Sequence, residues 1–256
     1  MSTGPLTHLQ ADSIDGVIDS LSRIVEWSKT HNSRAGYFAA LYRKVTVRIR
    51  DDIAAGKFED GARMERFDVI FANRYLEAFE QWQQGLPLTR VWQQAFALTE
   101  NWSPIVLQHL MIGMNAHINF DLGIAAAQTV KKEDLPKLKN DFDKINDVLA
   151  SMVDEVQNEL AQIWPLFRFV DKAAGRLDEK LADRGIELAR KEAWQWALDY
   201  AASDGEQREK AVRCMDEKVF LLGQLVVSPP LGLRSLLFLI RIGERQSVKQ
   251  VIEILE

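Results

Sequence analysis

The stretch that decides the fold is IVLQHLMIGMNAHINFDLGIAAAQTV, residues 105–130, in the middle of the chain. Apolar residues occupy nearly all sides of a helix drawn through it, and between Ile105 and Thr129 it contains no Lys, Arg or Glu. A helix with such a surface belongs inside a bundle, because burial must cover every face. We therefore predict a buried central helix over about 105–130.

The same stretch is long enough for a transmembrane helix, which needs about 20 apolar residues. We reject a membrane span because polar side chains in lipid are expensive and this segment has many of them. They are Gln108, His109, Asn115, His117, Asn119 and Asp121.

Helical spacing of apolar residues continues through most of the 256-residue chain. Only 14 residues are glycine and 7 are proline, so turns are few and the elements between them are long. We predict further helices over about 13–29, 35–55, 62–84, 88–100, 138–163, 186–202, 206–227 and 248–255. The sequence thus predicts an all-α fold: a single-domain multi-helix bundle over residues 1–256, with the C-terminal helices packed against the central one. A subdomain joint, if the chain has one, falls in the charged connection 131–137.

Composition excludes several classes of function. The net charge is −5 and the basic residues form no block, so the electrostatic footprint of a nucleic-acid-binding protein is missing. The single cysteine, Cys214, can form neither an internal disulfide nor a thiolate metal site, and residues 1–10 show no secretory signal. We expect a cytoplasmic protein without a nucleic-acid partner, while its oligomeric state leaves no mark in the sequence.

Standard catalytic motifs are absent. The chain has no phosphate-binding glycine loop, no dinucleotide fingerprint, no serine-hydrolase elbow and no C-x-x-C or H-E-x-x-H pattern. None of the four histidines belongs to a Glu-x-x-His pair, so a conventional di-iron carboxylate site is disfavoured.

Two polar seams remain on the central segment. With His109 at zero, Gly113 lies at about 40°, His117 at about 80° and Asp121 at about 120° on a regular helix. The glycine is expected to leave open room beside two imidazoles and a carboxylate. A second seam on the far side holds Gln108, Asn115 and Asn119.

Buried polar groups need partners on neighbouring helices. The segment 66–77 supplies Asp68 and Tyr75 on a mostly apolar face, with Arg74 beside them. Asp216 lies in an apolar stripe of a later helix, where its carboxylate requires a cation such as Arg190.

These residues allow three interpretations. In the first, His117 and Asp121 join His109 or Asp68 around a divalent metal, for which imidazole and carboxylate ligands suit zinc, iron or manganese. In the second, no metal takes part and His117 is a general acid or base oriented by Asp121 or Asp68, while Tyr75 and Arg74 bind substrate. In the third, both seams only fix the register of the helices.

Several segments carry a resemblance to a known family. Residues 110–122, with the core GMNAHINFDL, resemble the signature of an all-helical bacterial family of unknown function, and 36–43, 68–75, the Trp194 helix and 229–244 are similar to it too. The resemblance covers nearly the whole chain and implies one helical domain, but it implies no reaction. It also implies that one group is formed by Asp68, Arg74, Tyr75, His117, Asn119 and Asp121.

The sequence favours an intracellular enzyme that acts on a small molecule in a polar pocket beside His117, with or without metal assistance. The alternative is a non-catalytic helical scaffold or ligand-binding module whose buried polar seams are structural.

Overall fold

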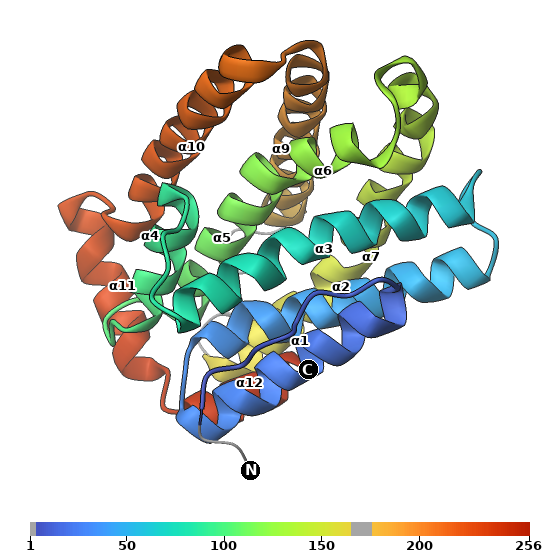
Figure 1. Cartoon of the computed structure of the whole chain (residues 1–256). Coiled ribbons are helices and arrows are strands. Elements are labelled where there is room, and N and C mark those ends of the chain that lie inside the picture. Colours follow the sequence, from blue (N-terminus) through green and yellow to red (C-terminus); the bar gives the residue numbers. More distant parts are fainter. Residues whose placement is uncertain (1–3, 165–175) are drawn as a thin grey trace.

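The computed structural model describes residues 4–164 and 176–256, and over these residues it contains helices and turns but no strand (Figure 1). The predicted all-α fold is confirmed. The first four helices are α1 (Ile14–His31), α2 (Ala35–Ala54), α3 (Gly61–Gln83) and α4 (Arg90–Thr99). The middle of the chain forms α5 (Val106–Met114), a π-helical segment η1 (Asn115–Asp121), α6 (Leu122–Thr129) and a short 3-10 turn η2 (Lys132–Asp134). Next come α7 (Leu135–Ile163), α9 (Arg176–Ala202), α10 (Gly205–Val227), α11 (Leu231–Gly243) and α12 (Val248–Leu255).

Local sequence signals explain where several helices begin and end. The Ser13 side chain accepts a hydrogen bond from the Gly16 amide at the start of α1, and Asn32 ends that helix in the left-handed region with φ 53°. Asp60 caps α3 by accepting from the Arg63 amide at 2.9 Å. Each cap satisfies a backbone group that the helix leaves unpaired.

The run formed by α5, η1 and α6 contacts most of the other helices. Helices α1 and α2 form an antiparallel pair, and α12 packs against both of them and against α7 (Figure 1). The run α5, η1 and α6 contacts α2, α3, α4, α9 and α10. One apolar cluster lies mainly among α1, α2, α3, α4, α5 and α12, and a second joins the beginning of α3 with α6, α7 and α9.

The middle segment differs from the regular helix that we predicted. Over Asn115–Asp121 it is a π-helix, and the Leu122 amide donates to the carbonyl oxygen of His117, five residues earlier. The wider turn means that a fixed rotation of 100° per residue does not hold across it. Single-turn π segments inside α-helices often mark functional sites, and this one carries both His117 and Asp121.

The C-terminal half differs from expectation in two further ways. Helix α9 begins at Arg176 and continues through Gly185, where we expected a break, because a glycine in a helix weakens it without stopping it. Of the C-terminal helices that we expected to pack against the middle segment, α9 and α10 contact it, whereas α12 packs on α1, α2 and α7.

Helix α11 contains no buried residue. Six of its large apolar side chains are exposed: Leu231, Leu233, Leu236, Phe238, Leu239 and Ile242. No single helix in the described residues is long and apolar enough to cross a membrane. Only α10 and α11 taken as a pair, bent by 66°, reach the length and composition of a broken span.

Gly123 is where α6 and α9 approach most tightly, so we expect Gly123→Ala to destabilise the fold by about 1 to 3 kcal/mol. A Cβ atom there would lie 2.6 Å from the Ala193 carbonyl oxygen and would also meet the Trp196 ring. Urea unfolding measures the change. The matched control is Gly185→Ala in α9, where no atom lies within 4 Å and alanine should stabilise by about 0.5 to 1 kcal/mol. Equal stability of the two variants would contradict this account of the packing.

Candidate functional site

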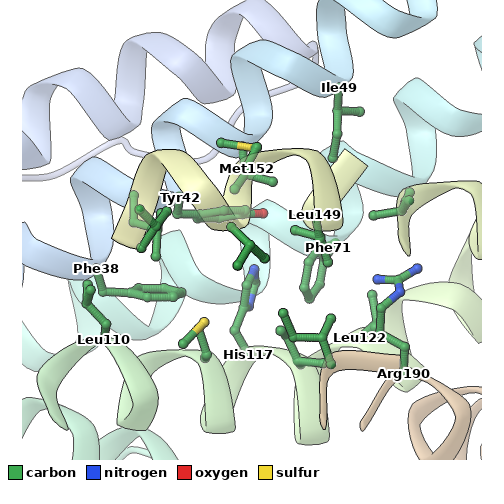
Figure 2. A pocket seen from close by; sticks show the side chains of 18 of the residues that line it. Phe38, Tyr42, Ile49, Phe71, Leu110, His117, Leu122, Leu149, Met152 and Arg190 are labelled. Atoms are coloured by element: carbon green, nitrogen blue, oxygen red, sulfur yellow. The ribbon is translucent and has the colours of Figure 1, made fainter. Parts of the chain in front are cut away.

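A cavity of about 300 Å³ lies between α2, α3, α7, α9 and the run from α5 to α6. Its size is at the lower end of the range for small-molecule sites. Most of the wall is aliphatic or aromatic, and the polar side chains that line it are Tyr42, Asp68, His117, Gln157 and Arg190. Figure 2 shows Phe38 and Leu110 at one end of this cavity, Arg190 at the other, and His117 between them.

Three side chains hold the imidazole of His117, and one of its two nitrogens has no hydrogen-bond partner among the described residues. Its ring stacks on Phe71 with centroids 3.6 Å apart, and the Tyr42 ring meets it edge-on at 4.6 Å. Nδ1 lies 3.3 Å from Oδ2 of Asp121, whereas the buried Nε2 has no hydrogen-bond partner among the described residues. Burial lowers the pKa of His117 and Asp121 only partly offsets that effect, so the imidazole is neutral at pH 7.

Asp121 is held by three donors. Its Oδ1 accepts from Nε of Arg74 at 2.7 Å, and its Oδ2 accepts from Nε1 of Trp92 at 2.9 Å, beside Nδ1 of His117. Burial alone would raise the pKa of Asp121, but Arg74 and His117 outweigh it and the pKa falls below its usual value. Asp121 is therefore a carboxylate, and as an acceptor it favours the His117 tautomer that carries its proton on Nδ1.

Two more polar atoms in the cavity wall lack partners in the described part of the chain, namely Oδ2 of Asp68 and the Tyr42 hydroxyl. Burial raises the pKa of Asp68 to about 7, so this carboxyl is about half protonated at neutral pH. Burial and the nearby Asp68 also hold the pKa of Tyr42 well above its usual value. At neutral pH Tyr42 and protonated Asp68 are therefore potential hydrogen-bond donors in a cavity that also contains one unprotonated imidazole nitrogen.

Arg190 forms the far end of the cavity. Its guanidinium is fully buried, lies over the Phe142 ring at 4.4 Å, and donates through one terminal nitrogen to the Phe142 carbonyl oxygen. Its Nε has no partner, and no described carboxylate forms an ion pair with it. Burial lowers the pKa of Arg190 to about 9.

Two of the predicted site residues lie away from this cavity. Tyr75 and His109 line a separate space of about 20 Å³ on the other side of Phe38. Such a space has room for a single water molecule. Burial lowers the pKa of His109 to about 3, and its nearest aromatic neighbour is Tyr37. The expectation that Tyr75 contacts a substrate beside His117 thus receives no support from the geometry.

The metal interpretation requires His117 and Asp121 to converge on one point with His109 or Asp68. The described residues contain no group of three His, Cys, Asp or Glu side chains arranged to hold a metal ion. Asp121 already accepts from Arg74 and Trp92, and His109 lines a different space from His117. These donors do not fit a zinc, iron or manganese centre, whose ligands must lie about 2.0 to 2.2 Å from one ion.

Two further expectations meet a different outcome. Gly113 does not leave open space, because a Cβ atom there would lie 2.6 Å from the Phe38 ring. The Asp216 carboxylate does not pair with Arg190 but accepts from the backbone amides of Arg90 and Val91 at the start of α4.

The second polar seam is satisfied by the backbone of α10. Gln108 donates to the Val226 carbonyl at 2.7 Å and Asn115 to the Val219 carbonyl at 3.0 Å, while Asn119 donates to Asn115. This seam fastens α10 to the middle segment. It places Asn119 outside the site, although the family resemblance grouped it with His117.

Comparison of the chain with known protein families gives a match that covers residues 14–229. The chain belongs to DUF5995, a family of unknown function. No curated protein and no solved structure matches the chain. Membership in an all-helical family of unknown function, expected from the sequence, is confirmed. The matched region contains every residue of this DUF5995 protein that lines the cavity.

Four residues of the DUF5995 site were not among the site residues expected from the sequence. Tyr42 and Phe71 lie inside the segments 36–43 and 68–75, whose resemblance to the family could have indicated both residues. Trp92 lies on the apolar stripe of its helix, and nothing in the spacing indicates that its indole donates to Asp121. Arg190 could not be placed at the cavity because α9 is remote in sequence from α2 and α3.

Proposed function

We propose that this protein is an enzyme that binds an apolar small molecule in the 300 Å³ cavity and moves a proton on it through His117. The observation that carries the proposal is the orientation of one imidazole. Its Nδ1 faces the Asp121 carboxylate, while its Nε2 is buried and unpartnered in the wall of the cavity, among the residues described. An oriented neutral imidazole with a free nitrogen is the arrangement of a general base.

The chemistry that fits these groups is proton abstraction next to a carbonyl. The proton leaves the substrate carbon and binds Nε2 of His117, the C–H electron pair becomes the new carbon–carbon double bond, and the carbonyl π electrons move to oxygen. Asp121 stabilises the imidazolium that forms. Return of the proton to the same carbon, on either face, re-forms the carbonyl, regenerates neutral His117 and releases the starting material or its stereoisomer.

The developing oxyanion needs donors in a dry site. The Tyr42 hydroxyl and the protonated form of Asp68 are unpartnered donors in the same apolar cavity. Figure 2 shows the Tyr42 hydroxyl directed toward the part of the cavity where His117 lies. We assign no step of this reaction to a metal, because the side chains present do not fit a metal site.

A second candidate, a non-catalytic ligand-binding module, is favoured by the mostly aliphatic and aromatic wall. The His117→Asn variant separates the two. An enzyme loses turnover while it stays folded, whereas a binding module keeps its ligand affinity and has no turnover to lose.

The test is solvent deuterium exchange into 2-decanone, an apolar ketone, followed by nuclear magnetic resonance. We expect exchange by the wild-type protein and a loss of about 10² to 10⁴-fold in His117→Asn. The control is His31→Asn, which changes an exposed histidine remote from the cavity and should exchange like wild type. Circular dichroism establishes that each variant is folded.

The pH profile adds a readout that a purely structural role would not move. Exchange should fall in acid below 6.5 as His117 gains a proton, and fall as pH rises through about 7 when Asp68 loses its proton. In Asp68→Asn the alkaline fall should disappear. Binding of 2-decanone without exchange by wild type would overturn the enzyme proposal in favour of a binding module, and absence of binding would overturn both.

The proposal includes a cytoplasmic location, which the exposed, unpaired Cys214 supports because free thiols suit a reducing compartment. It includes a small molecule as the partner and no nucleic acid, in line with the net charge of −5.

A further inference from the structure

Arg190 poses a problem that proton transfer at His117 does not solve. A buried guanidinium normally pairs with a carboxylate, because an uncompensated charge in an apolar interior is costly. Arg190 has only the Phe142 carbonyl and ring as partners, and its Nε is free in the described residues. The charge of Asp143 offsets only part of the effect of burial on the pKa of Arg190, and Asp143 forms its ion pair with Lys139.

This unpartnered group faces an apolar space. Around it the cavity is lined by aliphatic side chains, including Leu122, Ile145 and Ile186. Asp68 lies in the same wall, but the charge of Asp68 does not shift the pKa of Arg190, nor does the charge of Arg190 shift that of Asp68. Among the described residues Arg190 is therefore a buried cation without a counterion, at one end of an apolar cavity.

We propose that Arg190 binds the carboxylate of the ligand, so that the ligand class is a monocarboxylic acid with an apolar chain. The inference rests on the proposed function and specifies its substrate class. A planar carboxylate accepts two parallel hydrogen bonds along one edge of a guanidinium, and the free Nε belongs to such an edge. The ligand would supply the counterion that the protein does not.

The geometry also orients the ligand. Figure 2 places Arg190 and the pair Phe38 and Leu110 at opposite ends, with His117 between them. A carboxylate at Arg190 directs the apolar chain toward Phe38, so the chain passes His117. The reacting carbon therefore lies along the chain and not beside the carboxylate.

The experiment compares decanoate with 1-decanol, which has the same chain without the charge, by displacement of the uncharged fluorophore 1-aminoanthracene. We expect wild type to bind decanoate at least tenfold more tightly than decanol. Arg190→Met should remove this preference by weakening decanoate tenfold or more, while decanol affinity changes less than threefold. Arg190→Lys should keep part of the preference, because it retains the charge but loses the planar edge.

Arg208→Met is the matched control. Arg208 also donates to a backbone carbonyl, that of Ser203, and lies over an aromatic ring, Tyr200 at 4.8 Å, but it does not line the cavity. This variant should keep the wild-type preference. Equal affinity of wild type for decanoate and decanol, or equal weakening of both in a folded Arg190→Met, would overturn the carboxylate assignment and leave the apolar site standing. Failure of the fluorophore and both compounds to bind would overturn the proposed function as well.

Discussion

An Arg74→Met variant is expected to unfold at pH 7 with a free energy about 3 kcal/mol below that of the wild type. Arg74 and Asp121 form an ion pair of 2.7 Å in which the Asp121 side chain is 1% exposed and that of Arg74 is 25% exposed. Removing the cation leaves a buried carboxylate with only Trp92 and His117 as donors. The loss is large because the remaining charge stays desolvated.

The double variant Arg74→Met with Asp121→Asn tests this cause, since it removes the stranded charge and should recover part of the loss. The pH dependence gives a second check. The pKa of Asp121 is lowered by folding, so its stabilising contribution is present above its unfolded value of 3.8 and disappears as pH falls through the folded value. Chemical denaturation from pH 3 to 8 should show the difference between wild type and Arg74→Met shrinking toward the acid end. The exposed Arg66 on the same helix is the control, and Arg66→Met should stay within about 0.5 kcal/mol of wild type.

Asp68→Asn is expected to have the opposite effect and raise the free energy of unfolding at pH 8 by about 3 kcal/mol. Folding raises the pKa of Asp68 from 3.8 to about 7, roughly three units at about 1.4 kcal/mol each. The ionised carboxyl therefore destabilises the fold above pH 7. Asparagine removes that charge with little change in shape, although its buried amide subtracts part of the gain.

The sign of this effect fixes its pH window. Below 3.8 Asp68 is protonated in both folded and unfolded states, so wild type and variant should be equally stable with respect to this group. The advantage of Asp68→Asn should grow as pH rises from about 4 to 7 and stay constant above. Asp19→Asn, on the exposed face of α1, should show no such trend. A stability difference that does not depend on pH would contradict a buried, partly protonated Asp68.

The sequence predicted the helices well because their apolar stripes and end signals are local. Residues 45–49 alternate like a strand, yet their flanks have a helical period and they lie within α2, as predicted. Helix α11 was not predicted as an element in its own right. Its surface is apolar and none of its faces is buried, so the sequence shows no apolar stripe that would mark the side of the helix facing a core.

The structure brings part of the expected site together. His117 and Asp121 contact each other because neighbours one turn apart meet on a helix, while Arg74, which we expected to bind substrate, pairs with Asp121. The grouping of His109 with His117 required a regular helix between them. Packing among helices that are distant in sequence decides on which side of Phe38 His109 and His117 lie. It also decides the position of Arg190 at the end of the cavity.

The π-helical segment Asn115–Asp121 accommodates, in effect, one residue more than an α-helix would need over the same length. Deleting a single residue within it would let α5 and α6 join as one uninterrupted α-helix with conventional hydrogen bonds. Because the wider turns take up the extra residue, α5 and α6 would keep nearly the same rotation relative to each other, and only side chains within the segment would change the face on which they lie. His117 is one of these side chains, so its position relative to Asp121 and Arg74 would change. Relatives shorter by one residue in this stretch should therefore keep the packing of α5 and α6 and differ at His117.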